Sequence, residues 1–307
     1  DDRTAVCCLS SVNLEKYDEW KDSFMIADLI RFLDNVLQFF IDNAGDEISR
    51  ARYSAEQERS LGLGAMGWHS YLHKHRIPFE SELAKTKNIE IFDCIKLQAV
   101  AETEQLATER GECPDMEGTR RRNSHLLAIA PNANSSIICG TSPSIEPSKA
   151  NAYTHRTRAG SHLVKDKYLE EELEKVGRND TKAWTSIITN GGSVQHLKYL
   201  SDEVKAVFKT AIEINQNEIV IQAADRQEVL CQGQSLNVFF ASGASRLELH
   251  EVHYNAWKLG CKGMYYLRTE TSNKAENVST KIVRDALKDY ETQTMSINQE
   301  ECVACQG

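Results

Sequence analysis

The sequence has no run of residues that resembles a membrane span or a secretion signal. Nowhere does it approach the ~18 uncharged apolar residues that a membrane-spanning helix needs. Its start, Asp1-Asp2-Arg3, has neither a basic region nor an apolar one. Basic charge is also scarce, and a formal net charge of -9 disfavours a protein that binds the phosphate backbone of nucleic acids. We therefore expect a soluble protein that binds neither membrane nor nucleic acid.

The cysteines lack the spacing of a disulfide framework. Nine occur in 307 residues; two are adjacent and others are scattered, namely Cys7, Cys8, Cys94, Cys113, Cys139, Cys231 and Cys261. This distribution suits a reducing compartment, so we expect a cytoplasmic protein. The first residue is not Met, which indicates a processed product or a piece of something longer.

What the sequence does contain is an alternation of apolar strands and amphipathic helices. The patterns predict strands at 5–12, 126–130, 234–240 and 263–267, and helices at about 24–40, 88–110, 201–228 with a break near 215, and 247–259. This order predicts an α/β fold with mostly parallel strand pairing.

Three stretches receive plainer interpretations. The glycine-rich stretch 61–68 lacks the strand and helix context of a dinucleotide site, so it is predicted to be a packing segment that leads into a helix reaching His75. The basic cluster 120–122 is predicted to be a solvated turn before a strand. The charged stretch 165–184 is predicted to form surface helix and loop within an insertion.

Two features indicate chemistry. The apolar stretch 126–130 leads into the polar loop 131–136, and 137–139 is expected to open a helix whose free N–H groups point back at that loop. Such a loop suits a phosphate, although an ordinary capped turn has the same composition. Near the end of the chain, Cys302 and Cys305 form a CxxC pair on an accessible tail with few apolar side chains. A redox dithiol, half of a zinc site or an idle tail all fit that pair alone.

The order and spacing of several blocks resemble the large catalytic subunit of class I ribonucleotide reductase, from about Thr4 to Gly307. The blocks are 7–14 (CCLSSVNL), 130–136 (APNANSS) with 144–147 (SIEP), 234–237 (QSLN) and 263–269 (GMYYLRT), followed by the CxxC tail. The resemblance implies a ten-stranded α/β barrel made of two halves of five parallel strands. It identifies 1–270 with the second half and 271–307 with a flexible redox-active tail.

The resemblance also implies roles for particular residues. Cys7 matches one member of the cysteine pair that reduces the ribose, although alone it would be interpreted as a buried small apolar residue. Tyr265 and Tyr266 match a stacked pair that relays a radical, whereas neighbouring side chains on a strand normally point to opposite faces. Cys302 and Cys305 match the tail dithiol that re-reduces the active-site disulfide. The substrate diphosphate is expected against Pro131, Asn132, Ala133, Asn134, Ser135 and Ser136, although relatives often carry Ser, Glu or Thr at the second to fourth of these.

The implied activity is that of an oxidoreductase that converts ribonucleoside diphosphates to 2′-deoxyribonucleoside diphosphates. We expect this chain to bind no cofactor or metal of its own, because a radical-generating small subunit supplies a metal/tyrosyl radical cofactor. Thioredoxin or glutaredoxin is the expected reductant of the tail. A cobalamin-dependent reductase is disfavoured, because a tyrosine relay would then serve no second subunit.

Several family features have no counterpart in this sequence: the thiyl-radical cysteine, the second reducing cysteine and the effector-binding helices. We therefore expect a separate chain, the N-terminal half of the large subunit, to complete the barrel, as in the split large-subunit genes of some phages. Half a barrel would expose strand edges and apolar surface. The alternative is an inactive interaction module that docks the small subunit through its last helix and strand.

Overall fold

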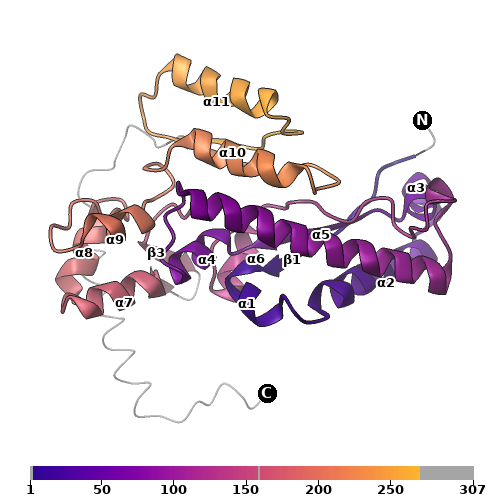
Figure 1. Cartoon of the computed structure of the whole chain (residues 1–307), viewed down its shortest axis with the longest axis horizontal. Helices are drawn as coiled ribbons and strands as arrows, with labels where there is room; N and C mark the ends of the chain where they lie inside the picture. Colours follow the sequence, from indigo (N-terminus) through magenta and orange to yellow (C-terminus); the bar gives the residue numbers. More distant parts are fainter. Residues whose placement is uncertain (1–2, 158–159, 270–307) are drawn as a thin grey trace, which may run out of the picture. The chain divides into compact units, whose positions relative to one another are not determined.

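The computed structural model describes residues 3–157 and 160–269. The Cα atoms of these residues cluster into two compact units, one made of residues up to 147 together with 214–269, and the other of 148–213. Figure 1 follows the chain through both. The second unit lies in sequence between two parts of the first, so the charged stretch 165–184 belongs to an insertion, as the sequence predicted.

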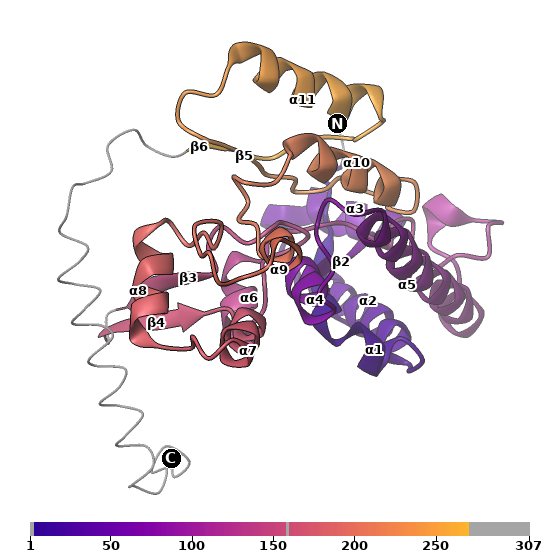
Figure 2. The same cartoon turned by 60° about the vertical axis from the view of Figure 1, so that its left-hand side comes forward.

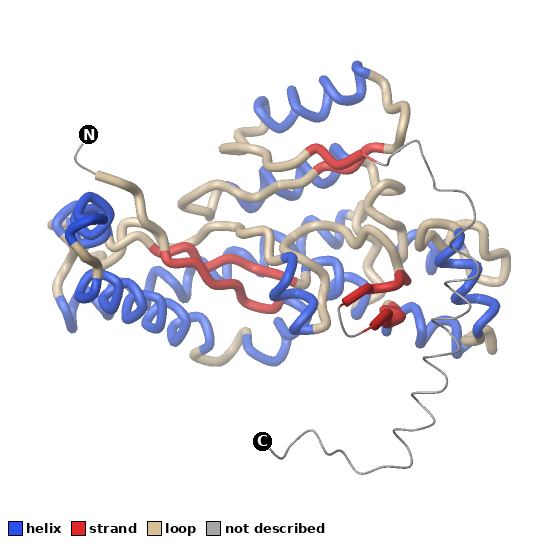
Figure 3. The backbone as a smooth tube through the Cα atoms, turned by 180° about the vertical axis from the view of Figure 1, so that it is seen from behind, coloured by secondary structure: helices blue, strands red, loops and turns tan. Residues whose placement is uncertain are grey.

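Five extended segments of the first unit pair in parallel, each with the next along the chain. Strand β1 (Cys8–Asn13) pairs with β2 (Leu61–Met66), and β5 (Val238–Phe240) pairs with β6 (Leu267–Thr269). Between these pairs, residues 127–129 bridge β2 on one side and Gln234 on the other. Both pairs are among the strands drawn in red in Figure 3, where the remaining red pair belongs to the second unit. This parallel order confirms the predicted α/β class.

The glycine-rich stretch 61–68 packs closely against its neighbours and leads into a helix, as predicted, but its residues 61–66 do so as strand β2. The strand was not predicted from the sequence because glycine is depleted in strands. The structure shows why the glycines are needed: a Cβ on Gly64 would lie 2.3 Å from the carbonyl oxygen of Ala128, and one on Gly62 would lie 2.4 Å from the Leu9 side chain. The neighbouring segments therefore approach too closely for any larger residue.

Other boundaries also differ from the predictions. The segment predicted as a strand at 126–130 makes only isolated bridges. The last strand was predicted at 263–267, whereas β6 is shorter and begins later, at Leu267. Helix α6 begins at Ala133 and not at 137. The hairpin of β3 (Ala152–Thr157) and β4 (Gly160–Lys165) was not predicted.

The helices of the first unit carry most of its core. They are α1 (Tyr17–Trp20), α2 (Met25–Asn43), α3 (Ser49–Glu58), α4 (Trp68–Lys74), α5 (Glu82–Arg110), α6 (Ala133–Cys139), α10 (Gln216–Gln227) and α11 (Arg246–Lys258). Helices α2 and α5 pack along each other, and α11 packs on α10 (Figures 1 and 2). Ser81 caps α5, since its hydroxyl accepts a hydrogen bond from the N–H of Ala84. No helix among the described residues is long and apolar enough to cross a membrane.

A buried carboxylate joins four segments of this unit. Asp34 of α2 is fully buried and accepts hydrogen bonds from Arg59, Arg110, Arg122 and Asn123, all within 2.9–3.1 Å. The interpretation of 120–122 as a solvated turn is therefore wrong for Arg122, which is buried against Asp34. Arginine is rarely buried unless it is paired, and the Asp34 carboxylate supplies the pairing here.

The second unit has a core of its own. Its helices are α7 (Lys167–Lys175), α8 (Thr181–Thr189) and α9 (Asp202–Val207). Leu173, Trp184, Ile187 and Phe208 are among the buried side chains of this core. The Asp166 carboxylate caps α7 by accepting hydrogen bonds from the N–H groups of Tyr168 and Leu169.

Candidate active site

Cys7 lies just before strand β1, over a glycine of the neighbouring strand. A Cβ on Gly62 would lie 2.8 Å from the sulfur of Cys7, and the same glycine lies under Leu9. Cys7 and Leu9 therefore point to the same side, as alternation along an extended chain requires. Cys8 has different neighbours: the charges of Arg59 and Asp34 act on its thiol.

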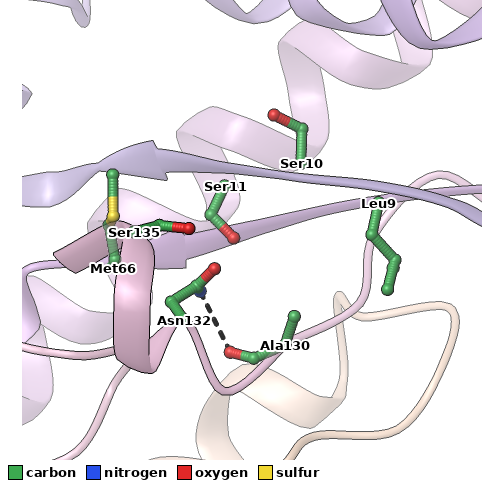
Figure 4. Close-up of a pocket in the computed structure, with 7 residues that line it drawn as sticks. All are labelled: Leu9, Ser10, Ser11, Met66, Ala130, Asn132 and Ser135. Carbon is green, nitrogen blue, oxygen red and sulfur yellow. Dashed lines mark hydrogen bonds between the residues drawn. The ribbon is translucent and has the colours of Figure 1, made fainter. Parts of the chain in front are cut away.

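A cavity of about 290 Å³ opens on the side of β1 that carries Leu9. It is lined by the residues shown in Figure 4, namely Leu9, Ser10, Ser11, Met66, Ala130, Asn132 and Ser135. The polar groups of Ser11, Asn132 and Ser135 point toward one another, while Ser10 points away from them (Figure 4). The Ser11 hydroxyl oxygen is buried and has no hydrogen-bond partner among the described residues. The cavity thus offers hydroxyl and amide groups to a polar ligand.

The predicted loop 131–136 includes the start of helix α6. Asn132 has a left-handed backbone (φ 53°), and its side-chain amide donates hydrogen bonds to the carbonyl oxygens of Ala65 and Ala130, at 3.2 and 3.0 Å. These bonds fix the loop to the end of β2. The first helical hydrogen bond runs from the N–H of Ser136 to Asn132, so the N–H groups before Ser136 have no acceptor within the helix.

The six residues predicted to bind the diphosphate lie in different surroundings. Asn132 and Ser135 line the cavity. Ala133 and Asn134 are exposed in the first turn of α6, and Pro131 is half-buried. Ser136 is buried, and its hydroxyl donates to the carbonyl oxygen of Ala133. Its side chain therefore supports the turn and does not line the cavity.

Tyr265 and Tyr266 have their rings in contact. The ring centroids are 4.0 Å apart and the planes are tilted by 50°, and both residues are about half exposed. Their contact differs from strict alternation because the two residues precede β6 instead of lying within it. The hydrogen bond with Tyr266 raises the pKa of Tyr265. The guanidinium of Arg268 lies 4.4 Å from the centre of the Tyr266 ring.

A hydrogen-bond chain joins three of the sequence blocks at this tyrosine pair. The side-chain amide of Asn237 donates to Glu146 at 2.8 Å, and its oxygen accepts from the backbone N–H of Tyr266 at 3.0 Å. The backbone N–H of Tyr265 donates to Leu236 at 2.8 Å. The blocks 144–147, 234–237 and 263–269, far apart in sequence, therefore meet.

The predicted site residues and those that the structure places at the site differ in two respects. Cys302 and Cys305 fall outside the described residues. Leu9, Ser10, Ser11 and Met66 line the cavity but were not predicted to, because only strand alternation combined with the pairing register could have assigned them to it. Within 3–157 and 160–269, no group of three or more His, Cys, Asp or Glu side chains could hold a metal ion.

Comparison with known families now places this site in a class. The chain matches the family model described as the ribonucleotide reductase barrel domain, over residues 1–121 and 117–267. The chain therefore belongs to the ribonucleotide reductase large-subunit barrel family.

Individual relatives agree with this family. The chain is 52% identical to a Frog virus 3 (isolate Goorha) protein assigned as a ribonucleoside-diphosphate reductase large subunit, covering 100% of this chain and 53% of that one. It is 48% identical to the large subunit of Invertebrate iridescent virus 6, covering 91% and 30% respectively. The class Id ribonucleotide reductase alpha subunit of Actinobacillus ureae superposes with a TM-score of 0.84 at 40% identity, covering 89% of this chain and 51% of that one. The chain spans about half or less of the length of these relatives.

Proposed function

We propose that this chain is the C-terminal half of the large subunit of an aerobic ribonucleoside-diphosphate reductase, active in complex with a complementary N-terminal half and a radical-generating small subunit. The observation that carries the proposal is that Cys7 lies on the same side of the extended chain as Leu9, two residues away, and that Leu9 lines a cavity together with Asn132 and Ser135 of the loop 131–136. A reducing thiol next to a site for a polar ligand is the arrangement that reduction of a bound ribose requires.

The chemistry assigns a distinct task to each part of the site. Backbone N–H groups at the start of α6, with Asn132 and Ser135, would hold the diphosphate. Loss of the 2′-hydroxyl needs two electrons, which Cys7 and a cysteine of the other half would supply by forming a disulfide. Cys302 and Cys305 would then reduce that disulfide by thiol exchange and be reduced in turn by thioredoxin or glutaredoxin.

The tyrosine pair would carry the radical from the small subunit toward the active site. Tyr265 and Tyr266 touch each other and remain half exposed, so one end of the relay is open to a partner. A phenol suits this role because its O–H can lose a proton and an electron together. The metal/tyrosyl radical cofactor that starts the relay would belong to the small subunit.

An exposed apolar face on α2 supports the need for a second half. Phe32, Val36 and Phe39 are 58%, 38% and 70% exposed, and their spacing places them on one side of the helix. Among the described residues, β1 pairs only with β2, so its outer edge is also unpaired. A barrel half supplied by another chain would cover both surfaces.

The alternative function is an inactive module that docks the small subunit. Helix α11 favours this alternative, because its side chains Leu247, Tyr254 and Trp257 are exposed. The helix shortly precedes the tyrosine pair in the sequence. An aromatic face of this kind is typical of a protein interface.

One assay separates the two functions. This chain is mixed with a candidate N-terminal half, a small subunit, a ribonucleoside diphosphate and a dithiol, and deoxyribonucleoside diphosphate is quantified, with each chain omitted in turn. The proposal predicts product only when all three chains are present. A stable three-chain complex without product would favour the docking module, and product from the purified chain alone would contradict the need for partners.

A further inference from the structure

Gln232 makes a direct contact with the sulfur of Cys7. Its side-chain amide nitrogen lies 3.1 Å from Cys7 Sγ and 2.9 Å from the carbonyl oxygen of Leu61. Gln232 lies two residues before Gln234, where the fourth extended segment pairs, and Cys7 lies just before the first. The side chain thus contacts β2 at Leu61 and also the residue that precedes β1.

The second contact determines which atom is the donor. A backbone carbonyl can only accept a hydrogen bond, so the group that faces Leu61 must be the NH₂ of the amide. That group has two hydrogens, and the one not used by Leu61 points at Cys7. The sulfur of Cys7 is therefore the acceptor in this contact.

The backbone of Gln232 is held on both sides. Its N–H donates to the carbonyl oxygen of Leu127 at 3.1 Å, and its own carbonyl oxygen accepts from the side chain of Gln227 at 3.0 Å. Next to it, the ammonium of Lys262 donates to the carbonyl oxygens of Leu230 and Cys231. With its main chain fixed in this way, Gln232 loses little conformational freedom when it contacts Cys7.

We propose that Gln232 is a positioning residue for Cys7: it fixes the orientation of the sulfur and stabilises it as a thiolate by donating a hydrogen bond. Whether Gln232 matters for turnover depends on the proposed function being correct. When a dithiol reduces the disulfide of Cys7, the attacking thiolate forms a bond to the partner sulfur and the old S–S bond breaks. The electron pair of that bond stays on Cys7 as a thiolate, which solvent then protonates. The second thiol of the dithiol, as a thiolate, attacks the resulting mixed disulfide and expels the partner cysteine as a thiolate, so that the dithiol ends as a disulfide.

The hydrogen bond from Gln232 is one of two interactions that stabilise the Cys7 thiolate against burial. Burial raises the pKa of the Cys7 thiol, and hydrogen bonds from Gln232 and Ser60 oppose that rise. The adjacent Cys8 is the next titratable group along the chain, and the charges of Arg59 and Asp34 act on its thiol.

The test measures the pH dependence of Cys7 alkylation in the full chain. Iodoacetamide labelling is followed by tandem mass spectrometry, which separates Cys7 from Cys8. Gln232→Glu keeps the shape but removes the donor, and we expect it to raise the midpoint of the Cys7 profile by about one pH unit, a tenfold loss of thiolate at a given pH. Gln232→Met removes the donor without adding charge, and we expect a smaller rise.

Gln98→Glu is the matched control, because Gln98 makes the same two kinds of contact with a different cysteine. Its amide nitrogen lies 3.2 Å from the sulfur of Cys94 and 2.8 Å from the carbonyl oxygen of Lys21. We expect this variant to leave the Cys7 profile unchanged.

Two outcomes would overturn the inference. One is a Cys7 midpoint equal to that of the wild type in both Gln232 variants. The other is a loss of folding in both, which would make Gln232 a structural residue; folding of one suffices for the test. The readout needs no turnover, so a chain that reduces no nucleotide would disprove the proposed function and leave this test intact.

Discussion

At the scale of the residue, single atoms decide whether the proposed chemistry works. The tyrosine pair is the clearest case, because its hydroxyls and not its rings would carry the radical. Removing one hydroxyl while keeping the ring separates the relay from packing.

We expect Tyr266→Phe to abolish diphosphate reduction in the three-chain mixture without weakening assembly. The ring would still contact Tyr265 and Arg268, which are 4.0 and 4.4 Å away by ring centroid and guanidinium carbon. Tyr199→Phe, in the other unit, is the control and should keep full activity. Turnover by Tyr266→Phe at the wild-type rate would disprove the relay.

Asp34 sets stability through its charge. Burial alone would raise the pKa of Asp34, but Arg59 and Arg122 outweigh burial and the pKa is lowered. A lowered carboxylate pKa stabilises the fold above the unfolded value of about 3.9. That contribution is lost as the pH falls through the folded pKa.

Asp34→Asn should therefore cost about 3–5 kcal/mol in the free energy of unfolding at neutral pH, because it leaves buried guanidinium groups without a carboxylate. Urea unfolding measures the loss, and the variant should also lose less stability on acidification than the wild type does. Asp46→Asn, whose partner Arg52 lies 3.7 Å away at an exposed site, is the control and should barely change the midpoint. Equal midpoints for wild type and Asp34→Asn would contradict this account.

At the scale of the element, β2 shows what the sequence could and could not reveal. The apolar strand β1 and the long helices followed from hydrophobic periodicity alone. Strand β2 did not, because Gly62 and Gly64 are present for close approach to neighbouring segments that the sequence pattern does not place. The prediction that Arg122 is solvated was wrong for a similar reason, since its partner Asp34 is 88 residues away in the sequence.

Gly64→Ala should destabilise the parallel arrangement, since its Cβ would lie 2.3 Å from a backbone oxygen that cannot move freely. We expect a loss of about 1–3 kcal/mol, measured by thermal unfolding. Gly233→Ala is the control: a Cβ there meets nothing within 4 Å, and the stability should change little. Equal losses in the two variants would show that space at Gly64 is not limiting.

The exposed face of α2 should matter only for assembly. Phe39→Glu places a charge on that face, so we expect it to weaken binding of the N-terminal half at least tenfold while the isolated chain keeps its melting temperature. Val176→Glu, the same kind of change in the other unit, should bind normally. Sedimentation velocity measures both, and unimpaired assembly of Phe39→Glu would remove α2 from the interface.

At the scale of the whole molecule, the candidate site draws on segments from the beginning to the end of the described chain. The resemblance of sequence blocks indicated Cys7, the loop 131–136 and the tyrosine pair. It could not show that Asn237 links Glu146 to Tyr266 or that Gln232 reaches Cys7, because both contacts depend on the order of the extended segments.

The central claim is that Cys7 supplies reducing electrons at this cavity. The most direct test quantifies deoxyribonucleoside diphosphate formed by the three-chain mixture with a small dithiol, comparing the wild type with Cys7→Ser and Cys302→Ser. We predict product from the wild type, none from Cys7→Ser, and continued product from Cys302→Ser, because the small dithiol replaces the tail. Product from Cys7→Ser at the wild-type rate would contradict the account.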